Sequence, residues 1–184
     1  QYIPPHGGGA HLSDLCGALE RVAGEGRTAL SDGITYLSEV ARRRSQCIVL
    51  SDLLPSSEPL SDTPAGELVE RYAAQLRARL AGLRAQKHDV VVVQVLDADE
   101  LELPFSGLTW FEDIEPGPDG PARLFVDPGD VRAAYKAEID RFLSAMRRGL
   151  READVEYHLV QTSRSIESVL LDILRGPLRR HIRK

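Results

Sequence analysis

The chain has 184 residues, of which 42% are hydrophobic and 28% charged, a composition typical of one folded globular domain. Its net charge of -5 provides no domain-wide basic field, which argues against nucleic acid as the main partner. No apolar run approaches the ~18 residues of a membrane span. Cys16 and Cys47 are too few for a disulfide framework, so we expect two free, buried thiols in a reducing compartment, the cytoplasm.

The first 45 residues predict two helices after a loose, Pro- and Gly-rich beginning. Apolar residues recur at helical spacing from Leu12 to Val22, and Gly24 and Gly26 end that helix. Thr28 is suited to cap a second helix, which we expect to continue into the run of three arginines at 42–44. These features are local helix chemistry and require no function.

The segment QCIVLSDLL, from Gln46 to Leu54, is the most informative part of the sequence. Its short, unbroken apolar run predicts a strand buried on both faces, as in a parallel sheet. Asp52 would then stand at the carboxyl end of the strand, where open α/β sheets bind ligands and metals. From position alone, a functional carboxylate and a residue that caps the following turn are both open interpretations.

The remaining chain alternates between helical and strand patterns. We expect helices at 66–85, 129–153 and 165–175, strands at 90–96 and 155–161, and a basic tail at about 177–184. A hairpin insertion at about 97–128 contains Trp110, Phe111 and Phe125, and it serves either as packing cover or as a docking surface for a partner. Asp97 follows its strand just as Asp52 follows the earlier one.

Strands that alternate with long helices predict βαβ units and a parallel sheet. The expected fold class is therefore α/β, a three-layer Rossmann-like arrangement with an inserted β-hairpin, and we expect residues 1–184 to form a single domain.

The order of several short motifs resembles a known family. RTALSDGITYL followed by IVLSDLL is similar to the second and third metal-site segments of a von Willebrand factor A-type domain. The series YIPP, SDLL, HDVVVVQVLD, LPFSG, FEDIE, VDP and AAY resembles an uncharacterised bacterial family of A-domain-like proteins associated with MoxR-type AAA ATPases. This resemblance covers nearly the whole chain.

The resemblance implies a Mg²⁺ site at the carboxyl edge of the sheet. Thr28 matches the threonine ligand of the family and Asp52 matches its last aspartate, and Mg²⁺ prefers such oxygen ligands. The DxSxS loop that supplies the other ligands does not occur in these residues, so the resemblance implies an N-terminally truncated, partial A domain. We therefore expect Mg²⁺ to be bound in a full-length parent, and weakly or not at all by these residues alone.

The preferred hypothesis for function is a non-catalytic protein-interaction module that works with a MoxR-type AAA ATPase. The alternative is a metal-dependent hydrolase or phosphotransfer protein that uses Asp52 and Asp97, because paired carboxylates hold a metal and activate water. If the strand at Gln46 lacks a neighbour, its open edge would recruit another chain, and we expect a homodimer through that edge.

Overall fold

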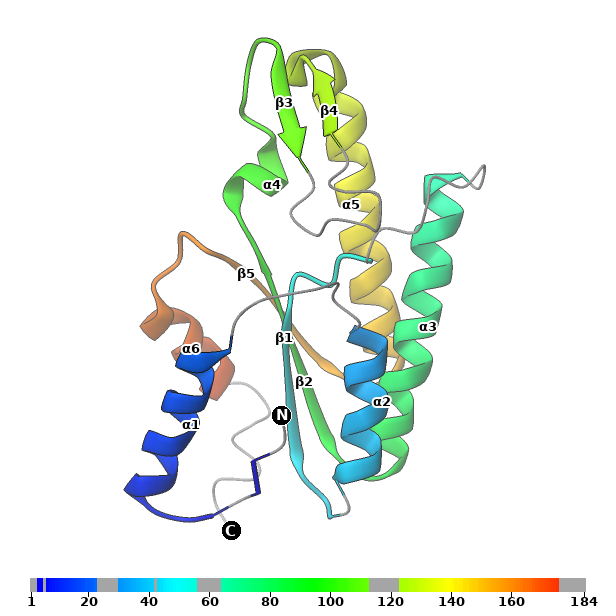
Figure 1. The fold of residues 1–184 in the computed structure, drawn as a ribbon. Coiled ribbons are helices and arrows are strands. Elements are labelled where there is room, and N and C mark those ends of the chain that lie inside the picture. The colour runs from blue at the N-terminus through cyan, green and yellow to red at the C-terminus, as the bar shows by residue number, and fades with distance from the viewer. Residues whose placement is uncertain are drawn as a thin grey trace.

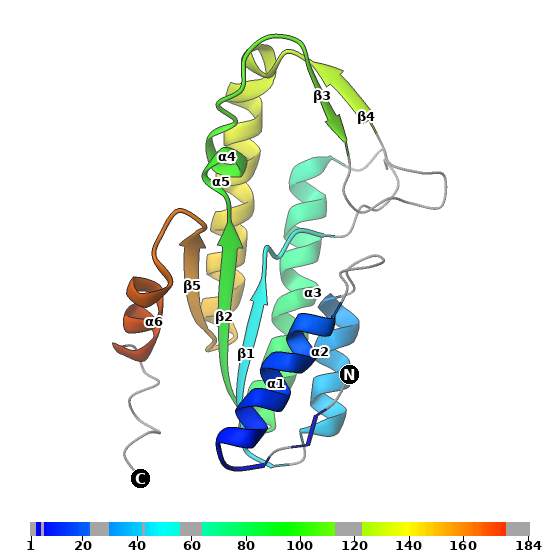
Figure 2. The same cartoon turned by 60° about the vertical axis from the view of Figure 1, so that its left-hand side comes forward.

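A computed structural model describes residues 3–4, 6–22, 30–41, 43–55, 64–112 and 123–175. The elements in chain order are α1 (Gly9–Arg21), α2 (Leu30–Val40), β1 (Gln46–Ser51), α3 (Ala65–Ala85), β2 (Asp89–Leu96), α4 (Ala98–Glu102), β3 (Thr109–Glu112), β4 (Arg123–Val126), α5 (Pro128–Glu152), β5 (Glu156–Gln161) and α6 (Ile166–Arg175). Helices α2, α3 and α5 lie on one side of the main sheet, and α1 and α6 lie on the other (Figures 1 and 2). The predicted α/β, Rossmann-like layout is confirmed.

The main sheet has three parallel strands in the order β1-β2-β5. Cys47 of β1 is opposite Val90 of β2, and Val91 of β2 is opposite Glu156 of β5. The central strand β2 follows from the run of valines at 90–93, whose side chains are buried alternately against the two sides of the sheet.

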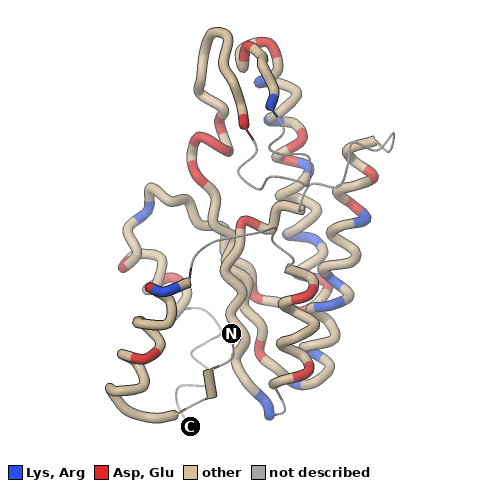
Figure 3. Tube along the Cα trace, in the orientation of Figure 1, with Lys and Arg blue, Asp and Glu red and all other residues tan. Residues whose placement is uncertain are grey.

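The main core lies between the sheet and the helices α3 and α5. Leu76, Leu80 and Leu83 of α3 are buried there, as are Phe142 and Met146 of α5. The two helices approach closely at Gly149, because a Cβ atom at that position would lie 3.4 Å from the carbonyl oxygen of Ala73. Acidic and basic residues recur along these helices (Figure 3), and ion pairs such as Arg77–Glu152 and Arg148–Glu70 between them are exposed. Their apolar sides therefore form the core while the charged sides remain in water.

The opposite side of the sheet has a smaller core. Val169 and Ile173 of α6 pack against Val91, Val93 and Val160, which belong to β2 and β5. Ile48 and Leu50 of β1 remain 52% and 71% exposed on this side. The prediction that the strand at Gln46 is buried on both faces is therefore wrong, because α6 packs against β2 and β5 and does not cover β1.

Two further expectations for the N-terminal half are wrong. Cys16 is exposed, because Ala18 is the buried residue of α1. Helix α2 ends at Val40, so Arg43 and Arg44 lie outside the helix and not in its last turn. Cys47, in contrast, is buried as predicted.

The hairpin insertion extends from the carboxyl edge of β2. The short helix α4 comes first, then the antiparallel strands β3 and β4, and these elements lie beside the N-terminal half of α5 (Figure 1). The hairpin itself is confirmed, whereas α4 was not predicted. The turn between β3 and β4 and the basic tail lie outside the described residues. Among the helices that the structure describes, none is both long and apolar enough to cross a membrane.

Candidate functional site

The turn that follows β1 holds Asp52 through two side-chain hydrogen bonds. The hydroxyl oxygen of Ser51 accepts a hydrogen bond from the Leu53 N–H at 3.0 Å, and Oδ1 of Asp52 accepts one from the Leu54 N–H at 3.0 Å. The Ser51 hydroxyl also lies 3.4 Å from Asp52 Oδ1. Asp52 is exposed, and its second carboxylate oxygen has no hydrogen bond to any described residue. Asp52 therefore caps the turn and keeps one oxygen available, so the two interpretations of this residue are compatible.

Leu53 fixes the direction of this turn. Its φ angle is 59°, a left-handed conformation that costs a residue other than glycine about 1–3 kcal/mol. Its side chain is fully buried in the main core, and burying a leucine contributes roughly 1.5–3 kcal/mol. Burial of Leu53 thus offsets the backbone strain and leaves the neighbouring Asp52 side chain in solvent.

Gln94 of β2 holds the backbone of this turn through a hydrogen bond. Its side chain is fully buried, and its amide nitrogen donates a hydrogen bond of 2.7 Å to the backbone oxygen of Asp52. Its amide oxygen accepts a hydrogen bond of 2.6 Å from the Tyr157 hydroxyl. Our reading of the sequence missed this residue, although the signal was present, since Gln94 is the one polar residue in the run VVVVQVL.

Two tyrosines near this edge are held in their neutral form. Burial raises the pKa of Tyr72 to about 12, and the nearby negative charge of Asp52 adds to the shift. Burial also raises the pKa of Tyr157, while the Arg147 guanidinium acts in the opposite direction. Both hydroxyls therefore remain protonated at neutral pH.

Asp97 caps the helix α4 at the end of β2. Its carboxylate accepts hydrogen bonds from the Asp99 N–H, at 2.9 Å, and from the Thr162 hydroxyl. The side chain of Glu100 accepts a bond from the Asp97 N–H in return, which completes a capping box. The hydrogen bond from Thr162 is the main reason that the pKa of Asp97 is lowered, and the Asp99 N–H is the second. Asp97 is thus already engaged in joining β2, α4 and the end of β5.

The structure describes only one of the two predicted metal ligands, Asp52. Thr28 lies outside the described ranges, so the structure does not place it. Within those ranges, no three His, Cys, Asp or Glu side chains form a group that could hold a metal ion. Of the two predicted ligands, Asp52 is the one that can be assessed, and its exposed carboxylate has one oxygen available to bind a metal ion.

Three residues of α5 hold the base of the hairpin insertion. Arg132 donates hydrogen bonds to the backbone oxygens of Leu103, at 2.9 Å, and Phe105, at 2.6 Å. The Tyr135 hydroxyl donates to the backbone oxygen of Glu100 at 2.6 Å, and Lys136 forms an ion pair with Glu102. The segment that leads into the hairpin is therefore fixed to a long helix before β3 begins.

The hairpin presents large apolar side chains to solvent. Trp110 and Phe125 are directly opposite on β3 and β4, and their rings lie 4.6 Å apart. Trp110 is 65% exposed and Phe125 is 49% exposed, and Leu108 and Leu124 nearby are exposed as well. An ion pair between Glu112 and Arg123, at 2.9 Å, lies at the next pair on the same face. We refer to Leu108, Trp110 and Phe125 as the aromatic surface. Of the two interpretations of the hairpin, the exposure of these side chains favours a docking surface over packing cover.

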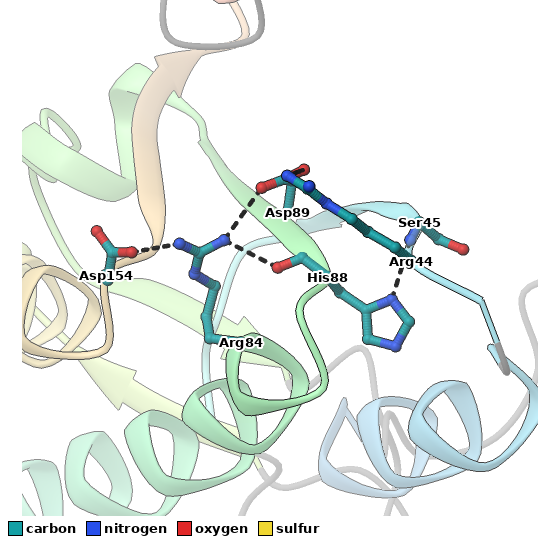
Figure 4. A network of polar contacts seen from close by, with 6 residues as sticks. All are labelled: Arg44, Ser45, Arg84, His88, Asp89 and Asp154. Atoms are coloured by element: carbon teal, nitrogen blue, oxygen red, sulfur yellow. Dashed lines mark hydrogen bonds and ion pairs between the residues drawn. The ribbon is translucent and has the colours of Figure 1, made fainter. Parts of the chain in front are cut away.

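A second polar cluster lies at the opposite, amino edge of the sheet (Figure 4). Arg84 of α3 donates to the backbone oxygen of His88 at 2.9 Å, pairs with Asp89 at 3.2 Å, and also pairs with Asp154. The N–H of Ser45 donates to Nδ1 of the buried His88 at 3.2 Å. These contacts connect the beginnings of the three strands, so the cluster has a structural role. The side chain of His88 is buried just after the turn that follows α3.

Asp89 of this cluster also affects the pKa of the Cys47 thiol in β1. Burial raises the pKa of the Cys47 thiol, and the charge of Asp89 raises it further. His158 of β5 contacts the Glu156 carboxylate at 2.7 Å through Nε2. These contacts do not connect Cys47 or His158 to the Asp52 turn.

Comparison with known proteins identifies a family but no characterised relative. Searches of the curated proteins and of the solved structures found no match. The model of one family, described as "Protein of unknown function DUF58", matches residues 1–141. The match includes β1, the Asp52 turn, Gln94, Asp97 and the whole hairpin insertion, and it ends inside α5. Since the matched residues make up most of the 184, the chain belongs to this family of unknown function.

Proposed function

We propose that this chain is a non-catalytic protein-interaction module whose partner binds to the aromatic surface. The observation that carries the proposal is the exposed pair of Trp110 and Phe125 on a hairpin whose base is fixed to α5. Exposed clusters of large apolar side chains mark interaction sites, and tryptophan is enriched among the residues that dominate binding energy.

The support of the hairpin matters as much as its exposed rings. Arg132 and Tyr135 hold the backbone from Glu100 to Phe105 through hydrogen bonds to its carbonyl oxygens. A surface that is ordered before binding loses less conformational entropy when the partner arrives. The aromatic surface is therefore suited to bind a protein without first refolding.

The resemblance to A domains extends the proposal to the Asp52 turn. In a parent chain that also supplies a DxSxS loop, Asp52 and Thr28 would serve as oxygen ligands of Mg²⁺, and the ion would accept a carboxylate of the partner. The available oxygen of Asp52 supports this part of the proposal. We expect the 184 residues alone to bind Mg²⁺ weakly or not at all, and micromolar affinity in isothermal titration calorimetry would contradict this.

The proposed partner is a MoxR-type AAA ATPase, and the proposed location is the cytoplasm. The resemblance stated above supports the first, and the two free cysteines support the second. The alternative, a metal-dependent hydrolase, has less support. The carboxylates of Asp52 and Asp97 both accept backbone hydrogen bonds as caps, which gives each a structural role without any chemistry.

The experiment measures binding of the chain to a purified MoxR-type ATPase from the same genome, by biolayer interferometry. We expect Trp110→Ala and Phe125→Ala each to weaken binding at least tenfold, which corresponds to about 1.4 kcal/mol. Tyr36→Ala is the matched control, because Tyr36 is an exposed aromatic residue on α2, away from the hairpin.

Three results would decide against the proposal in different ways. Equal affinity of the Trp110→Ala variant and the wild type would exclude the aromatic surface. No binding by the wild-type chain would exclude this ATPase as the partner. Turnover of a phosphate ester by the wild type with Mg²⁺, lost in Asp52→Asn, would establish the enzyme alternative instead.

A further inference from the structure

The hairpin insertion accounts for the net negative charge of the chain. Residues 97–128 contain nine aspartates and glutamates and one basic residue, Arg123, so their net charge is -8. The whole chain has 28 acidic and 23 basic residues, which leaves 19 acidic and 22 basic residues, or a net charge of +3, for the rest. In Figure 3, α4 and the end of β3 are red. A partner that approaches the aromatic surface therefore meets the acidic part of the molecule.

One face of the Trp110 indole is open within this acidic part. The indole packs against Phe125 with the ring centroids 4.6 Å apart and the ring planes 30° from parallel, so this contact covers one of its two faces. Trp110 is still 65% exposed. The open face of an indole attracts a cation that lies over it, because the π electrons make that face negative.

Glu112 supplies a carboxylate on the same side of the hairpin. It follows Trp110 by two residues in β3, so the two side chains share one face and lie about 7 Å apart along the strand. Arg123 of β4 donates a hydrogen bond to Oε2 of Glu112 at 2.9 Å, whereas Oε1 has no hydrogen bond to any described residue. The side chain of Glu112 is about half exposed. Glu112 is therefore able to pair with a second cation beside Trp110.

We propose that the partner binds the aromatic surface with a basic, apolar segment, in which a lysine or arginine covers Trp110 and pairs with Glu112. Large apolar side chains of the same segment pack on Phe125 and Leu108. This inference rests on the proposed function, because it takes the aromatic surface as the docking site and names the chemistry of the partner segment.

The charge of the insertion favours such a segment over other occupants. Exposed tryptophan and phenylalanine side chains also suit a lipid surface. An anionic bilayer, a nucleic acid or an acidic protein segment would, however, be repelled by a net charge of -8. A neutral apolar segment would leave the Oε1 atom of Glu112 without a partner. A basic apolar segment provides a contact for the indole face and for the carboxylate together.

The test uses Trp110 as its own probe, because it is the one tryptophan of the chain. Two synthetic peptides without tryptophan share the same leucines and phenylalanines at helical spacing, and carry either lysine and arginine or glutamate between them. We expect the basic peptide to shift the emission of Trp110 to shorter wavelength and to bind about tenfold more tightly than the acidic one. Its affinity should fall between about 0.1 M and about 1 M NaCl, because the Debye length decreases from about 10 Å to about 3 Å.

Three variants locate the interaction on the hairpin. Glu112→Gln should weaken binding of the basic peptide about threefold, the size of one exposed ion pair. Arg123→Ala should strengthen it by a similar factor, because the Glu112 carboxylate loses its internal partner. Glu152→Gln is the matched control and should change nothing. Its carboxylate is also about half exposed and paired with an arginine, but it lies at the C-terminal end of α5, away from the hairpin (Figure 1).

Several results would overturn the inference. They are equal binding of the two peptides, no response of Trp110 to the basic peptide, and a basic peptide that binds Arg123→Ala more weakly than the wild type. An emission shift with phosphatidylglycerol vesicles, and none with the basic peptide, would identify a membrane as the occupant instead.

The proposed function and this inference fail in distinguishable ways. If the inference alone is wrong, Trp110→Ala still weakens binding of the ATPase, but that binding does not depend on salt or on Glu112. If the ATPase alone is wrong, it does not bind, while Trp110 still distinguishes the basic peptide from the acidic one.

Discussion

The Tyr157 hydroxyl donates a 2.6 Å hydrogen bond to the amide oxygen of Gln94, inside the main core. Through the other end of the same amide, Gln94 reaches the backbone oxygen of Asp52. One buried side chain therefore connects all three strands of the sheet at the level where the Asp52 turn begins. A polar group that is buried in this way stabilises the fold only while both of its ends are paired.

We expect Gln94→Leu to destabilise the protein by about 1–3 kcal/mol, because it removes the partner of the Asp52 carbonyl and one partner of the Tyr157 hydroxyl. Tyr157→Phe alone should cost about 1 kcal/mol. The double variant should cost less than the sum, since both changes remove the same hydrogen bond between Gln94 and Tyr157. Urea unfolding of the four proteins measures this coupling, and strictly additive losses would contradict the connection.

The lowered pKa of Asp97 predicts a specific sensitivity to acid. Folding favours the charged carboxylate, so its contribution to stability is present above the unfolded pKa of about 3.9. The contribution is lost as the pH falls through the lower pKa of the folded state. The melting temperature of the wild type should therefore fall more steeply with acid than that of Asp97→Asn.

Thr162→Val is the informative companion variant, because it removes the largest cause of the shift and keeps the carboxylate. In an NMR titration, the midpoint for Asp97 should move up toward its usual value. An unchanged midpoint would mean that Thr162 is not the source of the shift.

Arg84 and Arg148 allow a comparison of two arginines in different surroundings. Arg84 is partly buried and contacts His88, Asp89 and Asp154, whereas Arg148 pairs with Glu70 and is half exposed. We expect Arg84→Ala to lower the free energy of unfolding by about 1–2 kcal/mol, since it removes the donor to the His88 carbonyl and one of the cations that pair with Asp89. Arg148→Ala should change it by less than about 1 kcal/mol. Equal losses in thermal or urea unfolding would contradict this assignment.

The two cysteines should differ strongly in reactivity. Cys16 is exposed, whereas Cys47 is buried and its raised pKa keeps the reactive thiolate scarce at neutral pH. A disulfide reagent such as Ellman's should modify one thiol per chain quickly in the native protein and the second only after unfolding. The fast reaction should disappear in Cys16→Ser and persist in Cys47→Ser.

The regular elements were predictable because each carries its own periodicity. The valine run of β2 and the apolar stripe of α5 are patterns within one segment, and both elements begin and end within about a residue of the expected ranges. The helix α4 was missed although its capping box, Asp97 followed by Glu100 at the third position, is a known signal of a helix start.

The wrong predictions concern contacts between segments, which the pattern of a single segment does not determine. The sequence of β1 shows that it is apolar, but whether Ile48 and Leu50 are covered depends on where α6 packs. For the same reason, the pattern of α1 could not show that Cys16 is exposed. At the candidate site, Asp52 was found from its position after a strand, whereas Gln94 and Tyr157 meet only through the pairing of β2 with β5.

The turn at Leu53 makes the orientation of Asp52 a property of the core. Replacing Leu53 by glycine would relax the backbone and at the same time release its anchor, so the turn would gain freedom on both counts. The carboxylate would then sample many directions, and a partner or ion would have to select one of them. Leu53→Gly would in this way reduce the affinity of the Asp52 carboxylate for an ion or partner without contacting either one. The buried Leu53 side chain fixes the orientation of the exposed Asp52.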